Sequence, residues 1–101
     1  MANRISYGTQ VSAAGGPVTL PGGAHIFGYS IRTNGVNDAT FTIYEESVAA
    51  ANARWEDGAI GADLGHPATF GDSPLKARGW NSPIVLVVTG IGAVCYVRTD
   101  V

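Results

Sequence analysis

An unbroken apolar run near the C-terminus is the strongest pattern in the chain. The run from Ile84 to Val88 contains no polar position. A strand with one face in water alternates apolar and polar residues, because successive side chains point to opposite faces. The run therefore predicts a strand that is covered on both faces. The turn residues 89–92 and the apolar run that follows them predict a C-terminal hairpin.

Alternation and turn residues predict further short strands before this hairpin. Residues 39–45 alternate most clearly, with Phe41 and Ile43 on one face and threonines on the other. Other strands are expected over residues 4–13, 18–20, 24–33, 52–56, 59–64, 68–70 and 75–77. In the third of these, Phe27, Tyr29 and Ile31 are expected to share a face. Residues 46–54 fit either a loop or a short helical turn.

Turn signals separate these strands. They are residues 21–23, 34–38, 57–58, 65–67, 71–74 and 79–82, rich in Gly, Pro, Asn and Asp. Seven to nine short strands with frequent turns predict an all-β fold, a single-domain antiparallel β-sandwich or jelly roll over residues 1–101.

Composition narrows the classes of partner. Charged residues make up 14% of the chain, below the roughly 25% of an ordinary soluble domain. The six Lys and Arg residues are scattered and the net charge is -2, so we expect no nucleic-acid partner. No apolar stretch approaches the length of a membrane helix or of a signal-peptide core, so we expect a protein made in the cytoplasm without a membrane anchor.

Residues that could carry out catalysis or bind a metal are few and scattered. Cys95 is the only cysteine, and its apolar neighbours predict a buried thiol that acts as a small hydrophobe. His25 and His66 lie in no metal-binding or catalytic spacing, so a structural role is expected for both. We therefore expect no enzyme activity, no cofactor and no metal. A Ca²⁺ site built from turn aspartates, and a small enzyme, remain as lesser alternatives.

Several segments together show a resemblance to a protein family. They are the strand from Thr40 to Glu45, the pair Pro74-Leu75, the corner Gly79-Trp80, and the stretch from Val87 to Val94. In this order they resemble the small β-sandwich virion proteins of tailed bacteriophages. The corner departs from the family pattern, in which Gly-Leu is commoner. The alanines at 49–51 are also unusual for that family.

The resemblance implies a capsid decoration, or cement, protein on the surface of the virion. Its implied partners are the major capsid protein and further copies of itself, as a homotrimer or homodimer. Because a short chain has little material to cover both faces of the C-terminal hairpin, we expect the oligomer interface there, at Ile84, Leu86, Val88, Val94 and Tyr96. A core that is two-sided within one chain is the alternative explanation of the apolar run.

Three further residues are expected to contact the capsid or another partner: Trp55, Arg78 and Trp80. The tryptophans also fit ordinary packing or stacking on a sugar ring. The alternative function is accordingly a tail- or fibre-associated module that binds glycans of the host surface.

Overall fold

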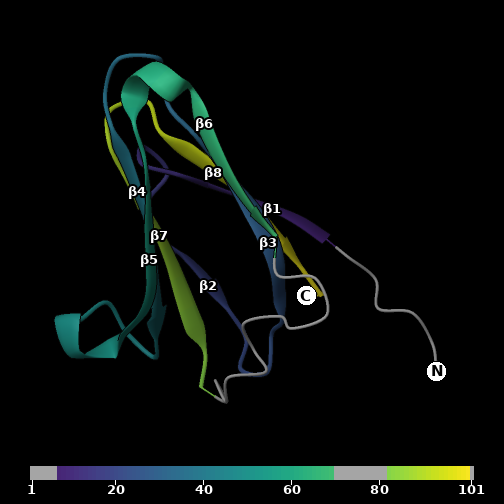
Figure 1. The fold of residues 1–101 in the computed structure, drawn as a ribbon. Helices are drawn as coiled ribbons and strands as arrows, with labels where there is room; N and C mark the ends of the chain where they lie inside the picture. The colour runs from purple at the N-terminus through teal and green to yellow at the C-terminus, as the bar shows by residue number, and fades with distance from the viewer. Residues whose placement is uncertain (1–6, 70–81, 101) are drawn as a thin grey trace.

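Two antiparallel four-stranded sheets pack face to face around one apolar core (Figure 1). The structure, a computed structural model, describes residues 7–69 and 82–100 of the 101-residue chain. Its strands are β1 (Tyr7–Ser12), β2 (Val18–Leu20), β3 (Ile26–Arg32), β4 (Ala39–Glu45), β5 (Ala53–Ala59), β6 (Gly65–Thr69), β7 (Ile84–Thr89) and β8 (Val94–Thr99). Single 3₁₀ turns, η1 (Ala50–Asn52) and η2 (Gly61–Asp63), precede β5 and β6.

The order of the strands is that of a jelly roll. One sheet, here called sheet A, has the order β1-β8-β3-β6, and the other, sheet B, has the order β2-β7-β4-β5. The first strand pairs with the last, the second with the seventh, the third with the sixth and the fourth with the fifth. A long antiparallel hairpin rolled up on itself has this topology. The predicted all-β sandwich or jelly roll is thereby confirmed, with eight strands in the described residues.

The apolar strand β7 is covered on both faces by its own chain. Ile84, Leu86 and Val88 point into the core between the sheets. Val85 and Val87 point to the outer face of sheet B, where Val85 is nevertheless buried. Its neighbours in the register are Thr19 on β2 and Tyr44 on β4. Such directly opposed side chains on one face of a sheet contact one another.

The expected C-terminal hairpin is wrong, because β7 and β8 lie in different sheets. The connection after Thr89 crosses the sandwich, and facing sheets are about 10 Å apart, a span that four or five residues can cover. Gly90 and Gly92 have positive φ angles of 121° and 70°, which glycine adopts without the steric cost of a side chain. A short glycine-rich turn can therefore connect strands of two different sheets as well as the two strands of a hairpin.

The strands in the middle of the chain also differ from expectation. Asp57 and Gly58 were expected to form a turn but lie inside β5, and residues 65–67 were expected to separate strands but lie inside β6. Residues 61–63 form η2 where a strand was expected, and the helical-turn alternative for residues 46–54 is realised as η1. The strands over 18–20 and 39–45 have the predicted bounds. The strand expected over residues 75–77 lies outside the described residues.

A β-bulge in β3 changes which residues share a face. The register with β8 shifts between Ile26 and Gly28. As a result Ile26 joins Tyr29 and Ile31 in the core, whereas Phe27 is half-buried and its ring stacks beside that of His25. Strict alternation would have placed Ile26 and Phe27 the other way round, and one extra residue in a strand reverses that alternation.

Candidate functional site: an apolar loop end

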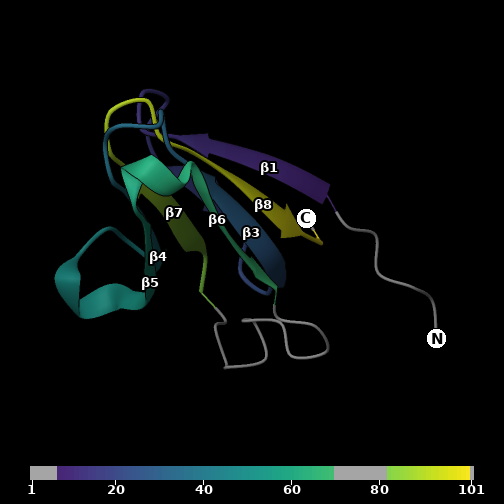
Figure 2. The ribbon, with the colours of Figure 1, turned by 45° about the horizontal axis from the view of Figure 1, so that its top comes forward.

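Three connections between the sheets meet at one end of the sandwich and expose aliphatic side chains there. They are residues 33–38 after β3, residues 60–64 after β5, and residues 90–93 after β7, gathered at the top of Figure 1 and brought forward in Figure 2. The side chains are Val36, Ile60, Leu64 and Ile91, which we call the apolar loop end. Their exposed fractions are 79%, 62%, 61% and 72%.

Hydrogen bonds tie the first two of these connections to each other. The Thr33 hydroxyl donates to the carbonyl of Gly61 at 2.8 Å, and the Gly61 N–H donates to Oδ1 of Asp38 at 2.8 Å. The Thr33 N–H donates to the carbonyl of Leu64 at 2.9 Å. Hydrogen bonds within the chain therefore fix the two connections that carry Val36, Ile60 and Leu64.

Two glycines allow the connections to approach this closely. A Cβ atom at Gly61 would lie 2.4 Å from the carbonyl oxygen of Val36, and one at Gly90 would lie 2.4 Å from that of Asp38. Real Cβ atoms do not approach other atoms so closely. The lack of a side chain at Gly61 and Gly90 thus allows all three connections to lie against one another.

Exposed apolar side chains are concentrated at this end of the sandwich. Four of the six large apolar side chains that the described residues expose belong to it. The same connections also expose the polar residues Asn34, Asp38 and Asp63. An apolar centre with a polar rim is the usual anatomy of an interface, and a cluster of exposed aliphatic residues marks an interaction site more often than scattered ones do.

The residues expected to form an oligomer interface lie elsewhere. Ile84, Leu86 and Val88 are in the core, where they pack between the two sheets and are not available to a second chain. Their assignment to an interface is corrected accordingly. Val94 and Tyr96 do lie on the outer face of sheet A, where Val94 is half-buried and the exposed fraction of Tyr96 is 50%.

Of the residues expected to contact a partner, Trp55 contributes to the packing of the chain itself. It is partly buried on β5 and packs against the core, and its indole N–H donates to the hydroxyl of Tyr29 at 2.8 Å. Arg78 and Trp80 lie outside the described residues.

Trp55 belongs to a polar network that joins the two sheets between β5 and β6. The Tyr29 hydroxyl donates to Oδ2 of Asp57 at 2.5 Å, and Nε2 of His66 lies 3.0 Å from the same oxygen. Burial and the hydrogen bond to Asp57 raise the pKa of Tyr29 above its ordinary value of 10.0. The phenol stays protonated and donates its hydrogen bond to the carboxylate of Asp57.

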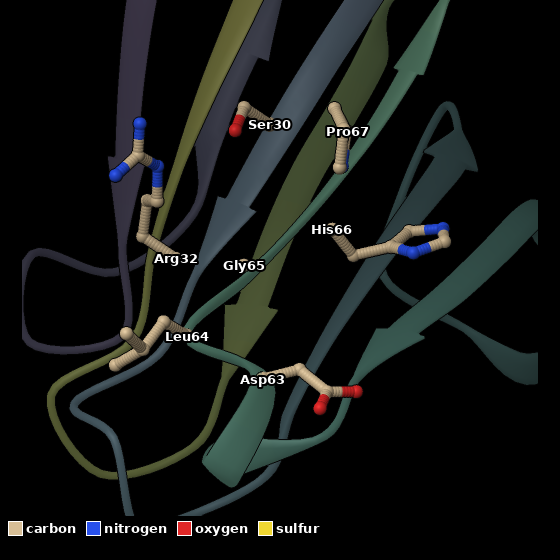
Figure 3. Close-up of a pocket in the computed structure, with 7 residues that line it drawn as sticks. All are labelled: Ser30, Arg32, Asp63, Leu64, Gly65, His66 and Pro67. Atoms are coloured by element: carbon tan, nitrogen blue, oxygen red, sulfur yellow. The ribbon is translucent and has the colours of Figure 1, made fainter.

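The outer face of sheet A carries two shallow hollows. One, of about 400 Å³, is lined by Ser30, Arg32, Leu64, Pro67 and neighbours. Figure 3 shows Arg32 and Ser30 on one side of β6, with His66 extending away from them. The other, of about 290 Å³, lies between Tyr96 and Arg98 on β8 and Ala68 and Thr69 on β6. Both hollows are open to solvent.

Cys95 is fully buried, as its apolar neighbours predicted, and burial raises the pKa of its thiol to about 12. Within residues 7–69 and 82–100, no three His, Cys, Asp or Glu side chains come together as a metal site would require. None of the helices in the described part of the chain has the length and apolar character needed to cross a membrane.

The apolar loop end was missed for two reasons: Val36 and Ile91 lie in segments that the sequence pattern marks as turns, and Ile60 and Leu64 lie in a segment that was expected to be a strand. Val36 stands between Gly35 and Asn37, and Ile91 stands between Gly90 and Gly92. A large aliphatic residue inside a glycine- and asparagine-rich turn has no strand to direct it into the core. That combination is the signal in the sequence that could have located the site.

A comparison of the chain with models of protein families, with curated proteins and with solved structures finds no match in any of the three.

Proposed function

We propose that this chain is a non-enzymatic structural protein of a tailed-bacteriophage virion, a capsid decoration protein that binds the major capsid protein on the surface of the head. The observation that carries the proposal is the apolar loop end, together with the resemblance of the strand and turn segments to small virion proteins. Jelly rolls serve many unrelated functions, so the fold by itself does not decide between them.

The loop end suits this role because it is already ordered before binding. A partner that contacts Val36 and Ile91 does not have to order a flexible loop, and ordering is one of the main costs of association. The hydrogen bonds of Thr33 and Gly61, and the close approach at Gly90, provide that order.

The size of the patch indicates that binding depends on several copies. Burying one Val, Leu or Ile side chain contributes about 1.5–3 kcal/mol, so four of them contribute roughly 6–12 kcal/mol. Association itself costs an estimated 4–15 kcal/mol. A single loop end therefore binds weakly. A repeating shell that engages several linked copies at once would bind them more tightly by avidity.

The test uses heads of the encoding phage that lack this protein. Purified chain is mixed with the heads and sedimented, and the bound fraction is measured against protein concentration. The double variant Val36→Asp/Ile91→Asp should weaken binding at least about tenfold, since a tenfold change corresponds to 1.4 kcal/mol and each buried aliphatic contributes more.

Val48→Asp is the matched control, because Val48 is another aliphatic residue with an exposed fraction of 54%, and it follows β4 at the other end of the sandwich. It should bind as the wild type does, and circular dichroism should show that both variants are folded. Wild-type protein that fails to bind the heads, or a double variant that binds normally, would contradict the proposal.

A second candidate is a tail- or fibre-associated module that binds glycans. The observation in its favour is the hollow between Tyr96 and Thr69, whose lining includes the exposed ring of Tyr96, Arg98 and the hydroxyl residues Ser30 and Thr69. An NMR titration with hexoses and hexuronic acids would separate the two functions. Chemical-shift changes confined to residues around Tyr96 would favour the glycan-binding function. The absence of such changes at high millimolar sugar would exclude that function.

A further inference from the structure

The four edges of the two sheets differ in how they are protected from pairing with another strand. An edge strand presents unpaired N–H and C=O groups, and natural proteins guard such edges with short strands, prolines, charges or bulges. Sheet A ends at β1 and β6, and sheet B ends at β2 and β5.

Three of the edges carry such protection. β2 has three residues and lies between Pro17 and Pro21. β6 contains Pro67, which has no N–H to donate. β5 carries Arg54, Glu56 and Asp57, and its register with β4 shifts at a bulge.

The fourth edge, β1, carries none of these features. Its six residues, Tyr7–Ser12, include no charge and no proline, and they pair with β8 in one continuous register from Tyr7↔Thr99 to Ser12↔Val94. Within residues 7–69 and 82–100, β8 is the only strand that pairs with β1, although Ser12 at the end of β1 also forms a bridge with Gly16 of the following turn. Figure 2 shows β1 along the outer margin of sheet A.

We propose that β1 pairs antiparallel with β1 of a second copy of this chain, about a two-fold axis, so that two copies of sheet A become one continuous eight-stranded sheet. An edge strand that meets itself about a two-fold axis forms a self-complementary interface. Charged residues in β1 would face like charges in the partner copy, and β1 has none. The outward-facing backbone groups of β1 before Ser12 supply the hydrogen bonds, since the Ser12 carbonyl already accepts one from the N–H of Gly16.

This interface lies on a different surface from the one that the sequence suggested. The sequence suggested an interface at residues of β7 that lie in the core, whereas the proposed interface is the edge of sheet A. The apolar loop end takes no part in it. Antiparallel pairing turns the two loop ends away from each other, so one dimer can reach two neighbouring capsid subunits. The bridging of two capsid subunits rests on the proposed function, but the dimer itself does not, since it forms without a capsid.

The dimer is expected to be weak. Stable interfaces bury about 1,200–2,000 Å² in total, and one pair of six-residue strands buries less. Sedimentation of the wild-type chain should therefore show a monomer at low micromolar concentration and a dimer at high micromolar concentration.

Two proline variants test the edge directly. Neighbouring residues in an edge strand direct their N–H groups alternately toward the sheet and away from it. Of Thr9→Pro and Gln10→Pro, one removes a hydrogen bond to β8 and lowers stability, and the other removes only an outward N–H. The variant that keeps the wild-type stability should be monomeric at every concentration.

A charge at the same edge provides a second test. Gln10→Lys places like charges near each other across the two-fold axis and should raise the dissociation constant of the dimer. Thr89→Lys, at an exposed position on sheet B, is the matched control and should dimerise normally. The loop-end double variant Val36→Asp/Ile91→Asp should also dimerise normally, which separates this proposal from the capsid-binding one.

Three results would overturn the proposal. The wild type could remain monomeric at high micromolar concentration. The stable proline variant could still dimerise. A monomeric wild type could bind phage heads while the stable proline variant does not. The last result would assign the β1 edge to a strand of the capsid protein in place of a second copy.

Discussion

The hydroxyl of Tyr29 on β3 lies 2.5 Å from Oδ2 of Asp57 on β5, so a side-chain hydrogen bond joins the two sheets. The indole of Trp55 donates to the same hydroxyl, and His66 contacts the same carboxylate. These four residues span the side of the sandwich where β5 and β6 form the free edges. The network stabilises the packing of one sheet on the other at that side.

Tyr29→Phe should lower the free energy of unfolding by about 1–3 kcal/mol, because the indole of Trp55 loses its acceptor and Asp57 loses a donor in a partly buried site. Urea denaturation followed by fluorescence or circular dichroism measures the change. Tyr96→Phe is the control, since Tyr96 is half-exposed on the outer face of sheet A, and surface changes usually stay within about 0.5 kcal/mol. Equal effects of the two variants would show that the network contributes nothing to stability.

The two faces of β7 should respond very differently to truncation. Leu86→Ala removes a fully buried side chain between the sheets and should cost about 2–5 kcal/mol of unfolding free energy. Val87, the next residue, points to the outer face and is only half-buried, so Val87→Ala should cost less than about 1 kcal/mol. Denaturation curves of the two variants provide the comparison. Similar losses would mean that a second layer covers the outer face of sheet B.

The pattern of residues predicts this strand but not its neighbours. Five apolar residues in a row identify β7 as a strand covered on both faces, and the alternation around Phe41 identifies the inner face of β4. Which strand lies beside β7 is a long-range property. The turn at Gly90 is compatible with a hairpin and with a corner between sheets, and local residues do not distinguish the two.

Local rules also fail where tertiary contacts compensate for a poor strand residue. The pair Asp57-Gly58 is typical of a turn. The carboxylate of Asp57 is bound by Tyr29 and His66, however, and these contacts allow Asp57 to lie in β5. Pro67 is tolerated in β6 because β6 is an edge strand. The apolar loop end escaped prediction for a different reason, since its residues come together only when three distant turns meet.

Gly61→Ala should disturb the apolar loop end. The added Cβ would lie 2.4 Å from the carbonyl oxygen of Val36, so one of the two connections must move. We expect a loss of about 1–3 kcal/mol in unfolding free energy, typical of forcing extra volume into a packed site. Backbone NMR shifts should change in residues 33–38 as well as near residue 61. Gly58→Ala is the control, because its Cβ would meet its nearest neighbour, the carbonyl of Ala39, at an ordinary 3.5 Å. Unchanged shifts in residues 33–38 of Gly61→Ala would contradict the close approach.

The carboxylate of Asp100 makes stability depend on pH in the acidic range. It accepts hydrogen bonds from the N–H of His25 at 2.7 Å and lies 2.8 Å from Nδ1 of the same residue. Burial alone would raise the pKa of Asp100, but the backbone N–H and the imidazole of His25 outweigh it and hold the pKa below the ordinary value of 3.8.

Because the folded-state pKa of Asp100 is the lower one, its ionised form stabilises the fold above that ordinary value, and the contribution is lost as the pH falls through the folded-state pKa. The free energies of unfolding of the wild type and Asp100→Asn should therefore differ at about pH 5 and converge below about pH 4. A difference between wild type and Asp100→Asn that grew toward low pH would mean that the carboxylate destabilises the folded chain when it is ionised.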